Sequence, residues 1–352
     1  MRRSIFTLAC LRLLVARLGF AIGILSGSIA PAAEPVNAAE PVAAAEPVDT
    51  IWLEPATVQR DQRPFLPRSL VRRHGTIESF DDQSLVFSPA GEDGSLQVAS
   101  SRVIWAEPGF SDQETIAAVA RFRAGQFKES ISPLLEAITR RPSVWRAQWL
   151  SMHLWQAAYR AQRYPAVLEL VEQIDARPLP ALLIGGLPIH WADGRLPPAA
   201  VEAAHNALAK PSSSPAARLV AASWLLGQSA DASAVVVIEA IAEQRERPLL
   251  AAIAETLLWR KATPPSLREQ RDQWKSRLAE LPLTLYPGPA ALLAHRLEAI
   301  GDREQALELF LSVAVTPPRP HEMSSYANTQ AVSLLEQLGR PEEAVLLKAA
   351  SR

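Results

Sequence analysis

A short pattern that returns at a nearly constant interval constrains this chain more than any other feature of its sequence. Gly125 is followed by Phe127, by the small residue Ser130 and by the apolar Leu134, and Pro142 closes the segment. A glycine that ends one helix and a proline that ends the next are typical of a hairpin of two helices.

Comparable segments recur along the chain. Gly301 and Gly339 lie 38 residues apart (339 − 301), and the segment at Gln162 comes 37 residues after Gly125 (162 − 125). A period of this length predicts stacked hairpins, because a single hairpin cannot bury its own apolar face. We therefore expect a mostly α-helical array over residues 111–352. The residues that define the pattern are Gly125, Phe127, Ser130, Leu134, Ala137 and Pro142; Tyr164, Val167, Val171 and Ile174; Gly301, Ala306, Phe310, Val313 and Pro318; and Gly339, Ala344 and Lys348.

These residues resemble the second half of the tetratricopeptide repeat. The small, large apolar and closing-proline positions of that repeat correspond to Ser130, Leu134 and Pro142 and to Ala306, Phe310 and Pro318. The resemblance covers four copies over residues 111–352. It implies an α-solenoid of helical hairpins whose concave surface binds another protein.

The composition describes a folded chain without a strong overall charge. Of its 352 residues, 48% are hydrophobic, which is enough for a sizeable core. Thirty-six basic and 37 acidic side chains leave a net charge of −1, so no nucleic-acid partner is expected. The single cysteine, Cys10, lies in a segment that we expect to be removed. We therefore expect no disulfide, no thiolate metal site and no cofactor.

Residues 1–32 have the pattern of a secretory signal peptide. A positively charged start precedes an apolar run over 18–30 that is short for a bilayer span, and small residues favour cleavage after Ala32. The alternative is an uncleaved anchor, because the wider stretch over 5–29 would span a membrane if its arginines reached the interface. Both interpretations predict an extracytoplasmic protein, periplasmic or secreted, and the second adds a membrane tether.

Residues 33–49 form a low-complexity spacer. The triplet Glu-Pro-Val begins at positions 34, 40 and 46, among alanines. Proline at this density favours extended, disordered chain, so residues 31–48 would reach up to about 55 Å. This is the length of a tether.

Residues 50–108 change from helical to alternating periodicity. Short β-branched and aromatic runs are separated by Asp-, Gly- and Ser-rich turns, which predicts about five strands. The expected strands are 51–53, 75–80, 84–87, 95–98 and 102–105. The pattern resembles SH3-like and Sm-like small barrels, and closure into an antiparallel barrel would remove exposed edges.

A basic cluster stands just before the expected second strand of this module. It contains Arg60, Arg63, Arg68, Arg72, Arg73 and His74. Such a cluster could contact phosphates, but acidic residues including Glu92 follow closely. A surface that balances its own charge is therefore the favoured interpretation.

Helical patterns fill most of the remaining chain. Capping boxes at Ser111 with Glu114 and at Ser266 with Glu269 are expected to begin two helices. Pro133 is expected either to shorten its helix or to kink it. Further helices are predicted over 216–226, 231–244, 249–261, 266–281, 287–300, 302–314, 324–338 and 341–350.

The helix after Ser143 carries a stripe of aromatic side chains. Trp145, Trp149 and Trp155 recur broadly along one face. Such a stripe forms core between hairpins or, in the alternative, lines a groove for a partner. The first reading is favoured, and the second makes these residues part of a candidate partner-binding surface.

Residues 177–198 interrupt the repeat. This insert is apolar and broken by glycine and proline, and it contains His190 and Trp191. Within a solenoid it would either plug or rim a concave surface, where a specific contact is expected, or serve as a packed connector. His190 and Trp191 complete the candidate partner-binding surface.

No motif in the sequence specifies a reaction. The six histidines lack metal-ligand spacing, and no phosphate loop, dinucleotide fingerprint or nucleophile elbow is present. His190 near Asp193 is the one imidazole and carboxylate pair that an enzyme would use. The sequence therefore favours a non-catalytic binding or scaffold protein, with a self-associating envelope component as the alternative and an enzyme as the third interpretation.

Overall fold

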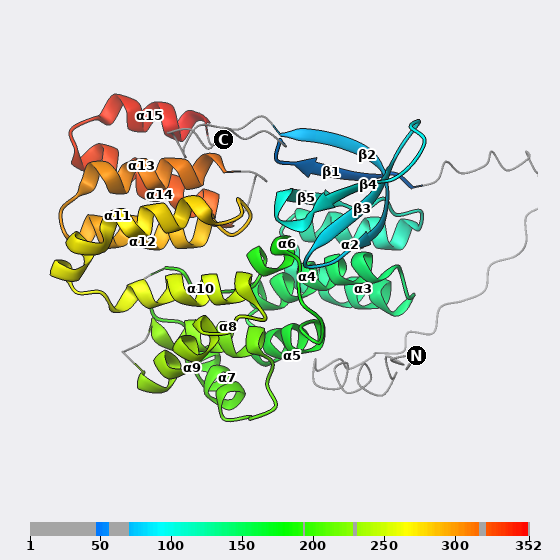
Figure 1. Ribbon diagram of the computed structural model, residues 1–352, viewed down its shortest axis with the longest axis horizontal. Coiled ribbons are helices and arrows are strands. Elements are labelled where there is room, and N and C mark those ends of the chain that lie inside the picture. Colours follow the sequence, from blue (N-terminus) through cyan, green and yellow to red (C-terminus); the bar gives the residue numbers. More distant parts are fainter. Residues whose placement is uncertain (1–46, 56–69, 193, 228–230, 317–321, 351–352) are drawn as a thin grey trace, which may run out of the picture. The chain divides into compact units, whose positions relative to one another are not determined.

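The computed structural model describes residues 47–55, 70–192, 194–227, 231–316 and 322–350. Within these ranges a five-stranded antiparallel sheet precedes fourteen α-helices (Figure 1). The mostly helical fold with a small sheet in front is therefore confirmed. The expected signal peptide, nearly all of the spacer and Pro318 lie outside the described residues. Residues 48–352 form one compact unit.

The sheet has the five strands that the sequence predicts. They are β1 (Asp49–Leu53), β2 (Val71–Phe80), β3 (Ser84–Pro89), β4 (Leu96–Ala99) and β5 (Val103–Glu107), with a short 3-10 turn, η1 (Ser100–Arg102), before β5. Alternate side chains such as Ile51, Leu53, Leu85 and Phe87 are buried, as expected of strands with one covered face.

The predicted closed barrel is wrong. The strand order is β4-β3-β2-β1-β5, and the sheet is open, with β4 and β5 as its outer strands. The edge at β5 is covered in another way, because the short helix α6 (Ala181–Gly185) lies against β5 and η1. Covering an edge with a helix removes the need to close the sheet on itself.

Three members of the basic cluster lie inside β2 and not before it, namely Arg72, Arg73 and His74, whereas Arg60, Arg63 and Arg68 lie outside the described residues. The Nδ1 of His74 shares a hydrogen bond with the Thr50 hydroxyl at 3.1 Å. Arg73 pairs with Glu92 at 3.1 Å, and the Arg72 guanidinium lies 5.2 Å from the centre of the Trp52 ring. These contacts agree with a surface that balances its own charge.

The helices follow the sheet in chain order. They are α2 (Gln113–Arg123), α3 (Phe127–Thr139), α4 (Val144–Arg160), α5 (Tyr164–Ile174), α6, α7 (Pro198–Leu208), α8 (Pro215–Leu226), α9 (Ala232–Ala242), α10 (Pro248–Leu258), α11 (Pro264–Glu280), α12 (Pro287–Ala299), α13 (Arg303–Val315), α14 (Glu322–Gln337) and α15 (Pro341–Ala350), with a 3-10 turn, η2 (Trp259–Lys261), after α10. Among these described helices, none has the length and apolar character needed to cross a membrane.

The sequence repeat is visible in the backbone of four turns. Gly125, Gly301 and Gly339 have positive φ angles of 75°, 85° and 74°, the left-handed conformation with which glycine ends a helix. Gln162 takes the same conformation at a φ of 59° without being a glycine. In each turn the following N–H donates to the carbonyl oxygen five residues earlier, at 2.8–3.0 Å. The helical repeat is therefore confirmed.

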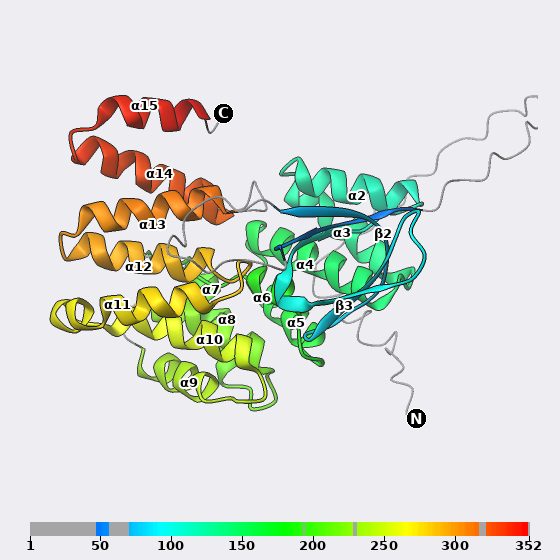
Figure 2. The same cartoon turned by 45° about the horizontal axis from the view of Figure 1, so that its top comes forward.

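Each of these turns joins a pair of helices: α2 to α3, α4 to α5, α12 to α13 and α14 to α15. Five residues after the turn residue, a buried side chain allows the two helices to pack closely. These positions are Ser130, Val167, Ala306 and Ala344. Figure 2 shows the last two hairpins side by side, with α13 against α14.

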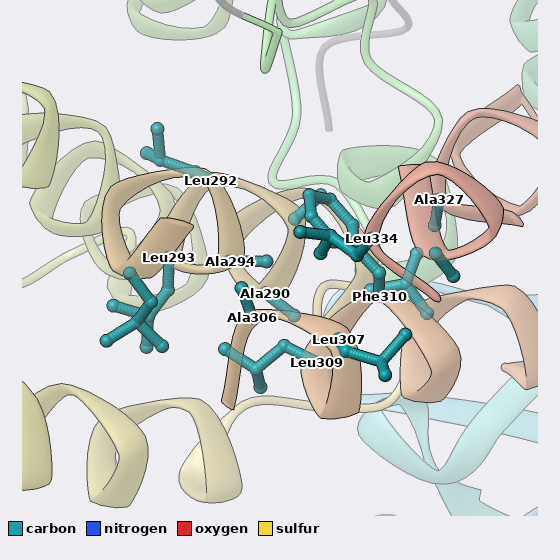
Figure 3. Close-up of a cluster of buried hydrophobic side chains, with 14 of the residues drawn as sticks. Ala290, Leu292, Leu293, Ala294, Ala306, Leu307, Leu309, Phe310, Ala327 and Leu334 are labelled. Carbon is teal, nitrogen blue, oxygen red and sulfur yellow. The ribbon is translucent and has the colours of Figure 1, made fainter. Parts of the chain in front are cut away.

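The core of the last two hairpins consists of alanine, leucine and aromatic side chains. Ala290 and Leu293 of α12 lie with Ala306 and Phe310 of α13 and with Leu334 of α14 (Figure 3). Alanine at the helix contacts permits a short interhelical distance, and the larger side chains fill the space around it. The predicted repeat positions at Leu134, Ala137, Ala306, Phe310 and Ala344 are all buried.

Two predicted helix starts are wrong. The cap of α2 is Asp112, whose carboxylate accepts the N–H of Thr115 at 2.7 Å, and not Ser111. Helix α11 begins at Pro264 with Thr263 as its cap, so Ser266 lies inside the first turn. Proline is tolerated in a first turn because it lacks only an amide that would be unpaired there. Helix α3 runs through Pro133 and is not shortened by it.

Candidate functional site

The three tryptophans of the predicted stripe are core residues. Trp145, Trp149 and Trp155 are 4%, 2% and 0% exposed. Their indole N–H groups donate to the carbonyl oxygens of Ile77, at 3.2 Å, and of Ala106 and Gly186, each at 2.8 Å. The favoured interpretation, that the stripe forms core, is therefore confirmed, and the alternative of an open groove lined by these three residues is wrong; a buried indole whose one donor is satisfied is stable.

Trp145 and Trp149 attach helix α4 to the sheet. Their acceptors belong to β2 and β5, so the helix crosses strands that are far from it in the sequence. Between them on the same helix, Arg146 pairs with Asp49 of β1 at 2.8 Å. The sheet and the first hairpins therefore share one core.

Asp49 is the centre of this junction. Its side chain is fully buried and also accepts the N–H groups of Ile77 and Gly109, each at 2.8 Å. A buried carboxylate is stable only when donors replace water, and three donors do so here. Asp49 lies at the end of the expected spacer in the sequence, where no local pattern indicates this role.

Asp175 makes a similar junction among the middle helices. It ends α5, is buried, and accepts the N–H of Ala216 at the start of α8 at 2.9 Å. Arg247, which caps α10, pairs with its carboxylate and donates to its carbonyl oxygen at 3.2 Å. Nothing in the local spacing distinguishes Asp175 from surface carboxylates, so sequence reasoning missed it too.

The insert is folded against the helical array. Its first part contains α6, in which Leu182, Leu183 and Ile184 are buried. Its second part, residues 186–192, contains no helix or strand, and we call it the strap. Within the strap Leu187 is buried, and residues 188–192 are half-buried.

Side chains from three elements that are far apart in the chain hold the backbone of the strap. Trp155 of α4 donates to the carbonyl oxygen of Gly186, and Trp224 of α8 donates to that of Pro188 at 2.8 Å. The N–H of His190 donates to the hydroxyl of Ser223 on α8 at 3.1 Å. The Arg260 guanidinium of η2 donates to the carbonyl oxygens of His190, at 2.5 Å, and of Ala192, at 3.0 Å.

The strap also makes tight steric contacts. Trp191 packs on Gly288 of α12 so closely that a Cβ at Gly288 would lie 2.2 Å from the indole ring. The imidazole Nε2 of His190 hydrogen-bonds with the carbonyl oxygen of Gly194 at 3.0 Å. The expectation of a packed connector is therefore confirmed for this segment, which lies across α4, α8, η2 and α12.

The predicted site residues are divided between two places. The structure brings Trp155, His190 and Trp191 together at the strap, whereas Trp145 and Trp149 lie at the sheet. His190 and Trp191 keep part of their surface in solvent, and Asp193 lies outside the described residues. The strap is therefore the candidate functional site.

Buried titratable side chains elsewhere serve the fold. Burial lowers the pKa of His153 to about 4, although its hydrogen bond to the carbonyl oxygen of Trp149 opposes the shift. Burial also raises the pKa of the Tyr286 phenol, whose hydroxyl contacts that of Ser312 at 2.6 Å. In the part of the chain that the structure describes, no three His, Cys, Asp or Glu side chains are arranged to hold a metal ion.

The fold defines a class: a chain of helical hairpins that shares its core with a small open antiparallel sheet. Comparisons with known protein families, curated proteins and solved structures find no match to this chain. Its function must therefore be argued from its own residues.

Proposed function

We propose that the chain is a non-catalytic binding or scaffold protein outside the cytoplasm. In this proposal the hairpins stack as a tetratricopeptide-like α-solenoid, and the sheet is an SH3-like or Sm-like module in open form. Residues 1–32 act as the export signal and 33–48 as the spacer, because Asp49 already belongs to β1. The partner is another protein.

The observation that carries this proposal is the strap. Its carbonyl oxygens are held by donors from α4, α8 and η2, while His190 and Trp191 remain partly exposed. A backbone fixed in this way loses little conformational entropy when a partner binds to its side chains. The strap thus has the rigidity of a preorganised docking surface.

The chemistry of the two side chains supports a protein partner. A partly exposed tryptophan is the type of residue that contributes most to protein interfaces. Trp191 packs its ring on Gly288, and the adjacent His190 places a polar ring beside it. The N–H and the carbonyl oxygen of His190 already bond to Ser223 and Arg260, so in this proposal the partner is recognised through the side chains.

A photo-crosslinking experiment tests the proposal. Gly194 is exposed, and no atom lies within 4 Å of a Cβ placed there, so it can be replaced by a photoreactive residue. On illumination this residue should cross-link to a single protein of an envelope extract, in a one-to-one ratio. The matched control is the same residue at Val236, 63% exposed on α9. Capture at 194 should fall at least tenfold in His190→Ala, with an unchanged thermal midpoint.

Two results would contradict this function. Equal capture at positions 194 and 236 would mean that the strap is not the contact surface. Capture at 194 that persists in both His190→Ala and Trp191→Phe would mean that these side chains do not recognise the partner.

A further inference from the structure

Arg260 fixes the backbone of the strap on both sides of Trp191. It lies in η2, directly after α10, and is only 9% exposed. One guanidinium nitrogen, Nη2, donates to the carbonyl oxygens of both neighbours of Trp191, at 2.5 Å to His190 and at 3.0 Å to Ala192. A terminal guanidinium nitrogen carries two N–H groups, so it can hold two acceptors at once. A rotation of the backbone at Trp191 would separate at least one of them from Arg260.

The side chain of Trp191 is held by a different element, α12. Its indole packs on Gly288 so closely that a Cβ at this position would overlap the ring. Tryptophan has only two side-chain torsion angles. With the backbone fixed by η2 and the ring seated on α12, the exposed part of the indole therefore has little freedom.

Helix α12 also contacts Arg260. Arg296, which belongs to the same helix as Gly288, donates from its Nη2 to the carbonyl oxygen of Arg260 and, at 3.5 Å, to that of Ala262. Gly288 and Arg296 are eight residues apart, so they lie on one side of the helix. Helix α12 therefore acts on Trp191 twice, directly through Gly288 and indirectly through Arg260.

Packing alone does not explain an arginine at position 260. Removing a guanidinium from water costs free energy, and an apolar side chain of similar volume often gives equal or greater stability. An apolar side chain cannot supply a donor to the carbonyl oxygens of His190 and Ala192. The charged donor therefore serves the orientation of the strap.

We propose that Arg260 is the positioning residue of the strap and that Arg296 acts through it. Arg260 sets the direction in which Trp191 meets a partner, without meeting the partner itself. This inference rests on the function proposed above, because a partner is what makes the orientation useful. The orientation itself is measurable without a partner.

Amide hydrogen exchange of the full-length chain measures the positioning. In Arg260→Met, the peptide that covers residues 186–192 should exchange about tenfold faster, because two hydrogen bonds from a charged donor are lost. Peptides from α4 and α8 should keep the rates of the native chain. An arginine with a merely structural role would instead change all three regions together.

A rescue variant and a control complete this test. Arg260→Lys should restore most of the protection, because both bonds come from one nitrogen and an ammonium group also carries several donors. Arg277→Met is the control, since this arginine of α11 forms its ion pairs with Glu255 and Glu280, away from the strap. It should leave the exchange of residues 186–192 unchanged.

A double-mutant cycle tests the link from Arg296 to Arg260. Arg296→Met alone should speed the exchange of the same peptide by about threefold. Added to Arg260→Met, it should change the exchange little further, because the side chain through which it acts is gone. Effects that multiply fully would show that Arg296 acts independently and would overturn the link.

Partner capture separates this inference from the proposed function. With the photoreactive residue at Gly194, capture should fall about tenfold in Arg260→Met and recover in Arg260→Lys. If the native chain captures no protein, the proposed function fails, and exchange alone decides whether Arg260 positions Trp191.

Three results would overturn the positioning role. The first is native exchange of residues 186–192 in Arg260→Met, and the second is an increase that α4 and α8 share equally. The third is native capture in Arg260→Met despite faster exchange, because the orientation would then have no effect on binding.

Discussion

At the scale of single residues, His153 shows how strongly the junction of sheet and helices excludes water. Its Nδ1 donates to the carbonyl oxygen of Trp149 at 2.9 Å. The centre of its ring lies 3.8 Å from the ring centre of Trp149 and 4.6 Å from the ring centre of Phe122. Desolvation penalises the charged imidazolium, and Arg123 adds a smaller repulsion. The folded protein therefore holds His153 in its neutral form.

This neutral histidine predicts a loss of stability in acid. The unfolded chain binds a proton as the pH falls below about 6.5, whereas the folded chain binds it only near a pKa of about 4. Unfolding is therefore favoured increasingly as the pH falls through this window, by about 3 kcal/mol in total. Urea unfolding measures the free energy of unfolding at pH 7.5 and at pH 4. Its decrease between the two pH values should be smaller in His153→Phe than in the native chain, by about 3 kcal/mol.

Other acidic groups change stability over the same pH range, so the comparison rests on the difference between the two proteins. If the native chain and His153→Phe lose the same free energy of unfolding between pH 7.5 and pH 4, the histidine is not held neutral by burial.

At the scale of secondary-structure elements, buried carboxylates join segments that local patterns do not connect. Asp49 links β1 to β2, to the segment after β5 and to α4, and Asp175 links α5 to α8 and to the start of α10. Each pairs with an arginine whose side chain is less than a quarter exposed. Such pairs specify which elements meet.

Asp49→Asn should destabilise the protein by about 3–5 kcal/mol, because it leaves the Arg146 charge without its buried partner. Arg73→Gln is the control within the same sheet. Its pair with Glu92 has side chains 47% and 59% exposed, so its loss should cost less than about 1 kcal/mol. Chemical unfolding of both variants measures the difference, and equal costs would show that Asp49 is not the junction described.

The sequence predicted those elements whose signals are local. The turn glycines at 125, 301 and 339, the helices from α8 to α15 and the five strands follow from periodicity and from the conformational freedom of glycine. Helices α6 and α7 went unpredicted, because α6 is short and lies in a Pro-rich segment that shows no helical period. Local signals also do not show whether the two outer strands pair with each other, so the predicted barrel failed.

The candidate site was predictable only in part. The interruption of the repeat correctly marked residues 177–198 as exceptional, and His190 and Trp191 lie there. Trp224 and Arg260, which hold the strap, were not identified, because their hydrogen-bond partners in the strap are 36 or more residues away in sequence and they look like ordinary helix residues. A contact of this separation leaves no periodic signal in a single sequence.

At the scale of the whole described unit, the insert changes how stability is distributed. In a simple repeat array each hairpin contacts its neighbours alone, so distant hairpins unfold separately. Here Gly185 of α6 lies against the backbone of Thr284, and Trp191 lies against Gly288, so the first half of the chain contacts the second directly. The described unit should therefore unfold in one transition.

Gly185→Ala tests this coupling. Its Cβ would lie 2.4 Å from the carbonyl oxygen of Thr284, a backbone atom that cannot move aside as a side chain does. We expect a loss of about 1–3 kcal/mol. Gly194→Ala is the control in the same insert, because no atom lies within 4 Å of a Cβ placed at Gly194. Its free energy of unfolding should stay within about 0.5 kcal/mol of that of the native chain.

The probes should be placed in both halves, on α4 and on α14. In Gly185→Ala their transitions should shift together along the urea axis. A shift at α14 with no change at α4, or equal effects of the two alanine variants, would show that the insert does not couple the halves.

The position of β1 has a mechanical consequence. It is the first strand in the chain, yet it lies between β2 and β5 and is antiparallel to both. A pull on the residues that precede Asp49 would load two hydrogen-bonded ladders in shear, together with the ion pair to Arg146. Because β1 is paired on both sides, pulling it out requires breaking both ladders, so we expect tension at this end to meet more resistance than tension on an outer strand.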